Sequence, residues 1–432
     1  MNHTISRRNF VKTGAAVAAA AAFASPRARG ANERLRLGII GTGNRGGQLI
    51  ERAKPHEDAE IVAICDVYEP HLDEWKAALG GGVATYADYR KMLEDTSLDG
   101  ILVASPDHWH ALHTIDACNA GFDVYCEKPM SYTIVEGRKM VEAARRNNAV
   151  VQVGLQRRSQ NLYLQLREMM KEEALGKITI GRSYRLSNMF PDGMGREEPG
   201  AVPPGLDWEM WLGPRPERLY QDNIAPYKFR WWKEYSSQMT NWGVHYFDLI
   251  RWQLGQEAIT STSVHGGVYA VNDDRTIPDT MEAIFEFPMG CLMVFGQYEA
   301  NQAPAILNNA EVELRGTQGT FYGRGNKGVI EPEKGGQFQD PAPRLERLEI
   351  NTDQPDPTIA HIRDWLDCIK SREKPRADAE IGHRSTTIAH LGNISMWTKS
   401  RIEWDAENER ITNNEAANDY LHYEYRAPWK LE

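Results

Sequence analysis

Two side chains of this 432-residue chain, Lys128 and His245, have the chemistry needed to take a proton from an alcohol as it is oxidised. Such an oxidation needs a base for the hydroxyl proton, and a nearby cation stabilises the alkoxide that develops as the hydride leaves. Histidine titrates near neutrality, and a lysine ammonium supplies the positive charge. The alternative for His245 is a hydrogen-bonded histidine of the core. Its setting, Gly243-x-His245-x-x-Asp248, favours catalysis.

Asn241 and Asp248 flank this histidine at helical spacing. If residues 241–254 form one helix, Asn241, His245 and Asp248 lie on one face, at i, i+4 and i+7. An aspartate at position 241 would orient the imidazole and raise its basicity, whereas the neutral amide of Asn241 only orients it. We therefore predict a contact between Asn241 and His245. The sequence leaves open whether Lys128 or His245 is the principal base.

A glycine-rich turn near the start of the chain predicts a phosphate-binding loop. It lies between an apolar strand and a helix and consists of Gly41, Thr42, Gly43, Asn44, Arg45 and Gly46. The glycines permit a tight turn, a close approach of the pyrophosphate and close packing of helix on strand. Asp66 ends the next strand, where it binds ribose hydroxyls and repels a 2′-phosphate. The motif predicts NAD over NADP; the alternative for Asp66 is a solvated acid.

Three histidines close together, His108, His110 and His113, raise the question of a metal site. Positions i and i+2 of a helix point apart, and no acidic or thiol ligand completes a set. We therefore predict no metal.

An alternation of apolar strands and helices predicts the sheet that positions the glycine turn, Asp66 and Lys128. Strands are expected at 35–40, 59–65, 100–104, 123–126 and 150–153, with helices at 48–54, 89–94, 110–120 and 134–147. This alternation is typical of a doubly wound parallel sheet of the Rossmann type. Ligands of such sheets bind at the carboxyl ends of the strands, where the glycine turn, Asp66 and Lys128 all lie.

The pattern changes after residue 155 to longer segments with strand character. These are expected at 177–188, 258–269, 281–287, 291–298 and 311–322, with helices at 161–172, 359–370 and 382–399. Pro288-Met289-Gly290 is a natural hairpin turn. We predict an α+β domain with a large open, mainly antiparallel sheet, and irregular segments at 191–226 and 323–343.

Length and composition indicate two globular domains. About 400 residues exceed one ordinary core, so we expect an NAD-binding domain at 33–155 and a substrate-binding and oligomerisation domain at 156–432. The net charge of −10, with acidic and basic residues interspersed, excludes a nucleic-acid surface. Five scattered cysteines without a CxxC pair predict buried free thiols.

The first 32 residues have the pattern of an export leader. The run Ser6 to Lys12 is a twin-arginine signal, and the alanine-rich stretch after it is shorter than the about 20 apolar residues that span a bilayer. We expect residues 1–32 to be a cleaved signal peptide with a short linker, and the twin-arginine export machinery to be a partner. The mature protein is then periplasmic, without a membrane anchor. Free dinucleotide is not expected there, so we infer that NAD is held tightly and recycled.

The chain resembles the Gfo/Idh/MocA oxidoreductases from residue 35 to residue 429. The most specific runs are Ser-Pro-Asp-His-Trp-His at 105–110, Glu-Lys-Pro at 127–129 and the motif around His245, while the runs at 382–386 and 425–429 resemble its exported branch. The resemblance implies hydride transfer between a bound nicotinamide and a carbohydrate or polyol alcohol, with His110 beside the nicotinamide. The cofactor contacts that it implies are Ser105, His108, His110, Glu127 and Lys128. His113 is interpreted as a surface or capping residue.

Substrate contacts are expected from the second domain and the domain junction, where aromatic faces and polar groups suit sugars. The candidates are Gln156, Arg157, Tyr184, Asn188, Tyr227, Arg230, Trp231 and His245. For the aromatic residues a core or interface role is the alternative. An open sheet with one uncovered face also predicts a homo-oligomer.

Three functions stay open at this point. The first is net oxidation of a ring alcohol, commonly at C3. The second is glycoside hydrolysis through transient oxidation, elimination and re-reduction, and the third is sugar binding without catalysis. The run Glu127-Lys128-Pro129 favours oxidoreduction, and the presence of both Lys128 and His245 argues against a binding protein.

Overall fold

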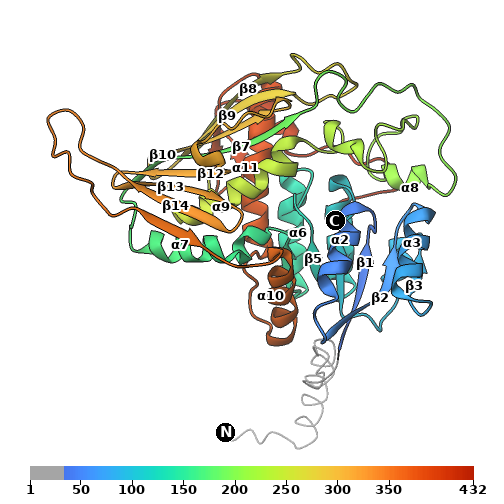
Figure 1. Ribbon diagram of the computed structural model, residues 1–432. Helices are drawn as coiled ribbons and strands as arrows, with labels where there is room; N and C mark the ends of the chain where they lie inside the picture. The colour runs from blue at the N-terminus through green and yellow to red at the C-terminus, as the bar shows by residue number, and fades with distance from the viewer. Residues whose placement is uncertain (1–33) are drawn as a thin grey trace, which may run out of the picture.

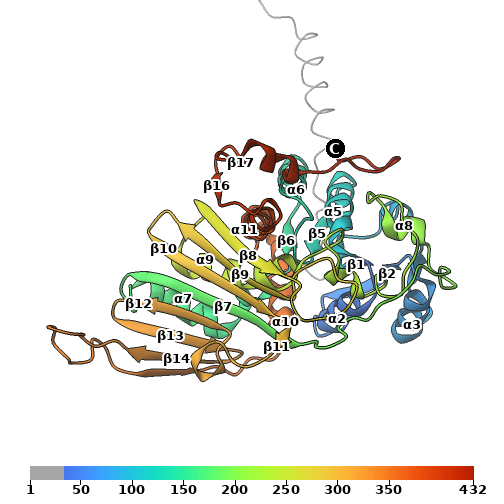
Figure 2. The same cartoon turned by 90° about the horizontal axis from the view of Figure 1, so that it is seen from above.

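The computed structural model describes residues 34–432, so the predicted signal peptide lies outside the described residues. The described chain forms an α/β body beside a wide sheet backed by helices (Figure 1; Figure 2, seen from above). No helix within 34–432 is long and apolar enough to cross a membrane.

The first body is a parallel sheet of six strands within residues 34–155, in the order β3-β2-β1-β4-β5-β6. The strands are β1 Leu35–Ile40, β2 Ala59–Cys65, β3 Ala84–Tyr86, β4 Gly100–Val103, β5 Asp123–Cys126 and β6 Val151–Val153. The helices are α2 Asn44–Ala53, α3 Glu69–Leu79, α4 Tyr89–Met92, α5 His110–Asn119 and α6 Ile134–Arg146. The strands are continuous apolar runs because helices cover both faces of the sheet. This confirms the predicted Rossmann sheet.

One of the covering helices comes from far along the chain. Helix α10, Pro357–Ser371, packs Ile362, Trp365 and Leu366 against the core of β1 and β5, on the same face as α2. A segment inside the range predicted for the second domain therefore completes the first core. The boundary at residues 155 and 156 stays a prediction.

The second body is built on a sheet of eleven strands among the described residues. Its order is β15-β14-β13-β12-β7-β10-β9-β8-β16-β17, and β11 pairs with β7. The strands are β7 Ile178–Asn188, β8 Ser261–Gly267, β9 Thr280–Phe287, β10 Cys291–Tyr298, β11 Ala300–Asn301, β12 Val312–Gly316, β13 Gly319–Arg324, β14 Lys327–Pro332, β15 Leu348–Asn351, β16 Ile402–Asp405 and β17 Arg410–Ile411. All pairs are antiparallel except β7 with β10, which confirms the mainly antiparallel prediction.

Helices cover one face of this sheet. They are α7 Asn161–Lys171, α9 Val244–Leu254 and α11 Ala379–Thr398, while the short α8, Trp208–Leu212, lies apart on the long connection after β7. Phe247 of α9 packs on Phe285 and Phe295, at the centre of the core. Helix α11 contacts α6 on one side and β8 and α9 on the other, so it joins the two bodies (Figures 1 and 2).

Three predicted elements differ from the structure. The single strand at 311–322 is a hairpin of β12 and β13 with a turn at residues 317–318, and the irregular segment 323–343 contains β14. The helix predicted at 241–254 starts at Val244, because residues Met239–Gly243 form a π-helical turn. The i+5 spacing of that turn changes which side chains share a face.

The cysteines agree with the prediction. All five, at positions 65, 118, 126, 291 and 368, are free thiols, and all are buried.

Candidate active site

A cleft of about 200 Å³ lies at the carboxyl ends of the Rossmann strands. Its floor comes from the glycine turn and the ends of β2 and β4, lined among others by Gly41, Gly43, Asn44, Arg45, Asp66, Tyr68, His71, Ser105, Trp109 and His113. Its roof comes from the connection between β7 and α9, through Leu206, Met210, Trp211, Pro226, Tyr227, Phe229 and Arg230. The cleft is therefore shared by both halves of the chain.

The glycine turn has the geometry expected of a phosphate cradle. Gly41 has a φ of +87°, and a Cβ on Gly46 would lie 1.8 Å from the carbonyl oxygen of Gly41. A side chain at position 46 would thus collide with the turn. Helix α2 begins at Asn44, so its unpaired N–H groups and the positive end of its dipole lie at the cleft.

Asp66 lies against this turn. Its carboxylate accepts hydrogen bonds from the backbone N–H of Thr42 at 2.7 Å and of Tyr68 at 2.9 Å, and it lies 3.3 Å from His71 Nδ1. Burial alone would lower the pKa of His71, yet the neighbouring Asp66 carboxylate raises it above its usual value. Sequence reasoning missed His71, because nothing in its helical context marks it as part of the cleft.

Arg45 lines the cleft and also braces helix α2 through an ion pair. Its Nε lies 2.7 Å from Glu127 Oε1, and Glu127 is only 3% exposed. The pair ties α2 to the end of β5, so Glu127 supports the predicted cofactor site through Arg45.

The histidines after β4 differ from their predicted positions. His110 is buried, and its ring nitrogens lie 2.6 Å from the Pro129 carbonyl and 2.8 Å from the Ser105 carbonyl. Both nitrogens therefore donate. Burial opposes the charge, but Cys126, Asp107 and the Pro129 carbonyl outweigh it and raise the pKa of His110 to about 9. His110 is a cationic brace between two loops, with no nitrogen left for the nicotinamide.

His108 and His113 are both buried as well. His108 Nε2 lies 2.9 Å from the Trp211 carbonyl, and burial lowers its pKa to about 3, which leaves it neutral beneath the roof of the cleft. His113 is no surface residue: it stacks on Trp109 at 4.7 Å, lies 3.0 Å from Ser105 Oγ and lines the cleft. The spacing of the three histidines gave no signal for this, because a short 3₁₀ turn, Asp107–Trp109, precedes α5.

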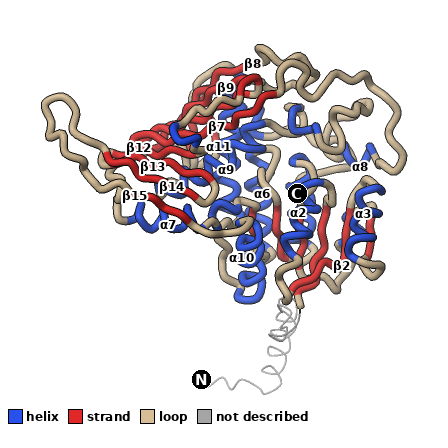
Figure 3. Tube along the Cα trace, viewed as in Figure 1, coloured by secondary structure: helices blue, strands red, loops and turns tan. Residues whose placement is uncertain are grey.

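The roof of the cleft is a packed segment, residues 189–235, which we call the lid. Figure 3 shows it as a long, mostly irregular connection between β7 and α9. The Glu69 N–H donates to the Gly205 carbonyl at 2.8 Å, and the Asp207 N–H donates to the Val67 carbonyl at 2.9 Å, so the lid is hydrogen-bonded to the chain after β2. Trp208 stacks on Trp211 at 4.8 Å inside the lid's own apolar cluster.

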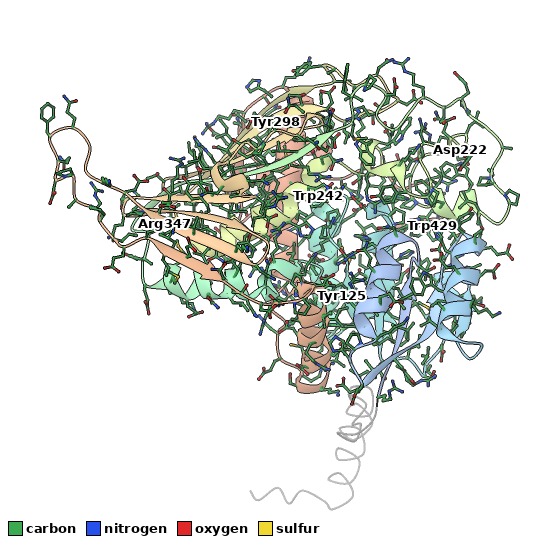
Figure 4. All side chains as sticks on the ribbon, in the orientation of Figure 1. Tyr125, Asp222, Trp242, Tyr298, Arg347 and Trp429 are labelled. Atoms are coloured by element: carbon green, nitrogen blue, oxygen red, sulfur yellow. The ribbon has the colours of Figure 1, made fainter. Side chains whose placement is uncertain are left out.

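The end of the chain, residues 422–432, fastens the lid. The Arg426 guanidinium donates to the Gly213 carbonyl at 2.8 Å, behind α8. The Trp429 ring meets Trp109, which lines the cleft, edge to face at 4.8 Å, and the Arg90 guanidinium lies over its other side at 5.1 Å. Figure 4 shows Trp429 between the lid and the Rossmann body. This end segment thus joins the lid to the wall of the cleft.

Lys128 and Asn241 meet where the two bodies join. Lys128 Nζ donates to the backbone oxygen of Asn241 at 2.7 Å and to its Oδ1 at 3.1 Å. Burial lowers the pKa of Lys128 to about 8, although Glu127 and Asp107 act in the opposite direction. The lysine therefore titrates close to neutral pH.

His245 is 8% exposed and does not contact Asn241 through a hydrogen bond. Its Nδ1 is buried and has no hydrogen-bond partner within residues 34–432. Burial, followed by the charges of Lys128 and Arg157, holds the pKa of His245 well below its usual value. The predicted contact with Asn241 is wrong, because the π-helical turn directs Asn241 to Lys128 instead.

Asp248 belongs to a buried ion pair rather than to His245. It accepts two hydrogen bonds from Arg158 Nε and one from Arg158 Nη2, between 2.8 and 3.0 Å, and another from Ser385 Oγ at 2.7 Å. Asp248 and Arg158 are 1% and 5% exposed. The pair joins α9 to the start of the second body.

The two junction residues differ in whether their side chains already have partners within the described protein. Arg157 forms a two-pronged ion pair with Glu311, at 2.5 and 3.1 Å, and lies 4.8 Å over Tyr246. Its guanidinium is therefore engaged within the protein. Gln156 Oε1 is buried without a partner among the described residues, which keeps it a candidate for substrate.

Tyr184 and Asn188 lie on the other face of β7 from His245. Tyr184 packs near Tyr298 at 5.8 Å, and Asn188 is exposed, whereas Arg185 lies over Trp242 on the helix-covered face. Side chains alternate along a strand, so a one-residue difference in position exchanges the faces. Arg185 and Ser187, rather than these two residues, lie on the face of β7 that the helices cover.

The remaining candidates lie in the lid. Tyr227 and Arg230 line the cofactor cleft, and the Arg230 guanidinium lies 4.4 Å over both Tyr227 and Phe229. Trp231 donates its indole N–H to Glu299 at 3.0 Å, so its polar edge is engaged. No group of three or more metal-ligating side chains occurs in the part of the chain that the structure describes.

Comparison with known proteins identifies the family. Residues 35–155 match the oxidoreductase family with an NAD-binding Rossmann fold, and residues 166–431 match the C-terminal alpha/beta domain of the same family. The chain belongs to the Gfo/Idh/MocA oxidoreductase family. It is thus an NAD-dependent oxidoreductase. Residues 4–24 match the twin-arginine translocation signal, which implies export.

Relatives of this Gfo/Idh/MocA protein include dehydrogenases of polyols. A myo-inositol 2-dehydrogenase of Thermotoga maritima is 25% identical over 380 residues, which cover 85% of this chain and 98% of the relative. The rhizopine catabolism protein MocA of Rhizobium meliloti is 26% identical over 262 residues, 60% of this chain and 69% of the relative.

Solved structures share the fold. A levoglucosan dehydrogenase in complex with NADH has a TM-score of 0.66 at 17% identity, covering 86% of this chain and 99% of the other. The WlbA dehydrogenase of Bordetella pertussis, in complex with NADH and UDP-GlcNAcA, has a TM-score of 0.64 at 20% identity, with the same coverage.

Proposed function

We propose that this protein is a periplasmic oxidoreductase that transfers a hydride between a tightly held NAD and a ring alcohol of a sugar or glycoside. The observation that carries the proposal is Lys128 Nζ, fixed on Asn241 after the carboxyl end of β5 and within electrostatic range of Arg45 and Arg230, which line the cleft. Family membership and the polyol and sugar dehydrogenases among the similar proteins support the choice of substrate class.

Lys128 is the principal base in this proposal. With a pKa of about 8, a useful fraction of its amine is neutral near pH 7 and accepts the hydroxyl proton. His245 stays neutral, because its pKa is low and no carboxylate partners it within the described chain. Its free Nδ1 then hydrogen-bonds the reacting hydroxyl group and orients it.

The residues of the cleft fit NAD. The cofactor, when bound, supplies the hydride acceptor. The glycine turn and the start of α2 hold its phosphates, and Asp66 holds the adenosine ribose and disfavours a 2′-phosphate. Arg230 has no ion pair within residues 34–432 and lines the cleft, which makes it a phosphate partner from the lid.

Retention of the cofactor is supported by the lid and by the end segment that fastens it. Release of NAD requires the lid to open, and opening breaks the contacts of Arg426 with Gly213 and of Trp429 with Trp109. A dinucleotide loaded before export would therefore leave slowly. Gln156 and His245 remain the proposed substrate contacts from the junction.

A covered cofactor also favours a second candidate, a glycoside hydrolase that oxidises its substrate transiently. In that reaction the hydride returns to the same sugar, so no exchange of NAD is needed. Both candidates use Lys128 and His245 in the same first step, the oxidation of the ring alcohol.

A homo-oligomer is proposed on the uncovered face of the second sheet. Ile284 and Leu292 lie there, 44% and 38% exposed, on neighbouring strands. Apolar side chains on an open face are a common basis for association.

The test uses the mature protein as purified from the periplasm. We expect bound NAD, and we expect a suitable sugar or glycoside to reduce it, as seen in the absorbance of reduced nicotinamide. A keto-sugar in the product supports the oxidoreductase, and released aglycone with unchanged NAD supports the hydrolase. A protein that neither holds NAD nor changes any saccharide after NAD is supplied would end both proposals.

A further inference from the structure

Arg185 is a cation of the second body that is separated from His245 by one side chain, Trp242. It stands on β7, and its guanidinium lies 4.2 Å over the indole of Trp242. The same indole lies 6.4 Å from the ring of His245, centroid to centroid. Trp242 therefore contacts both groups, and in Figure 4 it lies near the boundary of the two bodies.

The charge of Arg185 is not paired within the described chain. Its Nε is buried and has no hydrogen-bond partner, and no carboxylate of residues 34–432 forms an ion pair with it. Other buried arginines differ: Arg157 pairs with Glu311, Arg158 with Asp248 and Arg275 with both Asp273 and Glu299. A buried guanidinium nitrogen without a partner is costly, so a ligand that supplies one is favoured.

The acids near Arg185 are already engaged. Glu299 lies 2.5 Å from Arg275 Nη1 and also accepts hydrogen bonds from Trp231 and Gln238 at 3.0 Å. Glu311 is held by Arg157 and Tyr163. Neither carboxylate therefore neutralises the charge of Arg185.

Two further polar atoms in this region have no partner. Ser187 Oγ, on the same face of β7, and Gln156 Oε1, at the domain junction, are both buried and without hydrogen bonds among the described residues. Together with Arg185 they offer one charged donor, one hydroxyl and one amide acceptor. This set fits a ligand that has a carboxylate and hydroxyl groups.

We propose that Arg185 binds the carboxylate of an acidic sugar, so that the substrates of this site are uronic acids or their glycosides. The inference rests on the proposed function, because it names the substrate class of the same site. A planar carboxylate takes two parallel hydrogen bonds from a guanidinium, and the guanidinium of Arg185 packs on the ring of Trp242.

The experiment compares matched pairs of sugars on the NAD-containing protein. The methyl glycosides of glucose, galactose and mannose are set against the methyl glycosides of the corresponding uronic acids. Reduction of bound NAD gives the apparent KM, and calorimetry gives the Kd independently of turnover. We expect one uronide to bind at least about tenfold more tightly than its neutral counterpart.

Variants assign the effect to Arg185. Arg185→Met is expected to weaken binding of that uronide about 10- to 100-fold, with less than about threefold change for the neutral sugar. Arg185→Lys, which keeps the charge, is expected to recover part of the loss and serves if the methionine variant does not fold. The control is Arg182→Met, on the same strand but on the opposite face.

The outcomes separate the two proposals. If neutral sugars reduce the cofactor and no uronide binds more tightly, the acidic-sugar inference is overturned while the proposed function stands. Equal losses for both sugars in Arg185→Met overturn it as well, because Trp242 and Arg185 then act as a brace. If no sugar reduces the cofactor, the proposed function fails, and calorimetry still decides whether Arg185 binds a carboxylate.

Discussion

Lys128 Nζ donates to Asn241 Oδ1 at 3.1 Å, and Asn241 Nδ2 in turn donates to Gln238 Oε1 at 3.3 Å. Gln238 Nε2 donates to Glu299 at 3.0 Å. The side-chain amides of Asn241 and Gln238 each accept one hydrogen bond and donate another. The Glu299 carboxylate can only accept, so it fixes the orientation of both amides and places the Asn241 oxygen toward the lysine. The residue at position 241 therefore acts on Lys128, and its neutral amide holds the lysine amine in place without adding a negative charge beside it.

Asn241→Asp is expected to raise the pH at which reduction of the bound cofactor is half-maximal. The new carboxylate lies against Lys128 Nζ and favours its charged form, so the pKa of Lys128 rises from about 8 toward the ordinary 10.5. A lysine base acts only when neutral, so the profile moves to higher pH, by about one unit or more. Rapid-mixing measurements of nicotinamide absorbance across the neutral and alkaline range test this, with Asn161→Asp as an exposed control. An unchanged midpoint would contradict the contact.

Lys128→Met and His245→Gln are expected to have different effects on the rate of cofactor reduction and on its pH dependence. Loss of a general base lowers the rate of cofactor reduction about 10²- to 10⁴-fold, so Lys128→Met should show this loss and no rise in rate near pH 8. His245→Gln keeps a hydrogen-bonding side chain and should lose about tenfold, with the pH midpoint unchanged. Single-turnover rates as a function of pH measure both. The assignment is reversed if His245→Gln removes the pH dependence and Lys128→Met keeps it.

The sequence was sufficient where local spacing determines geometry. Gly41 and Gly46 must be glycine because the turn has a positive φ and no space for a Cβ, and both constraints act within six residues. Asp66 and Lys128 follow apolar strands, so the parallel sheet brings them to one edge. These positions could be predicted because strand ends in such a sheet share a side.

The other features of the site depend on strand faces, helix geometry and long-range contacts, which cannot be derived from a single sequence. The choice between Tyr184 and Arg185 rests on the face that β7 turns to α9, which a shift of one residue exchanges. The predicted contact between Asn241 and His245 does not form, because one π-helical turn changes the direction of the Asn241 side chain. The sequence predicts residues 191–226 as an irregular segment. Only long-range contacts, such as the hydrogen bond from the Asp207 N–H to the Val67 carbonyl, show that this segment is the roof of the cofactor cleft.

Arg158→Met is expected to lower stability without moving the catalytic pH profile. Removal of the guanidinium leaves the buried Asp248 carboxylate without its main partner, and breaking a buried ion pair costs about 3–5 kcal/mol. Because Asp248 does not hold His245, the pH midpoint of cofactor reduction should stay in place. Denaturant unfolding measures the free energy, and Arg410→Met, which removes an exposed pair with Glu415, is the control. A shifted pH midpoint at unchanged stability would restore a catalytic role for Asp248.

Gly46→Ala is expected to yield a folded protein without bound NAD. The added Cβ would lie 1.8 Å from the Gly41 carbonyl oxygen, so the turn must open and the phosphate cradle is lost. Absorbance of the purified protein and mass spectrometry of the released nucleotide report occupancy. Gly81→Ala is the matched control, because a Cβ there meets nothing within 4 Å. Full occupancy in Gly46→Ala would place the cofactor elsewhere.

Arg426→Ala and Trp429→Ala are expected to accelerate loss of NAD while the fold is kept. Arg426 ties the lid at Gly213, and Trp429 packs on Trp109 at the cleft wall, so each change removes one fastening of the lid. Charge-assisted hydrogen bonds contribute about 1.5–3 kcal/mol, which corresponds to dissociation about 10- to 100-fold faster for Arg426→Ala. Gel filtration followed by nucleotide analysis over time gives the rate, and Arg410→Ala serves as an exposed control. Because Lys128 is held by Asn241 and by neither of these residues, the single-turnover rate with NAD in excess should stay near that of the unaltered protein. Unchanged retention in the double variant would mean that the lid closes without the end segment, and that the cofactor is held by the Rossmann body alone.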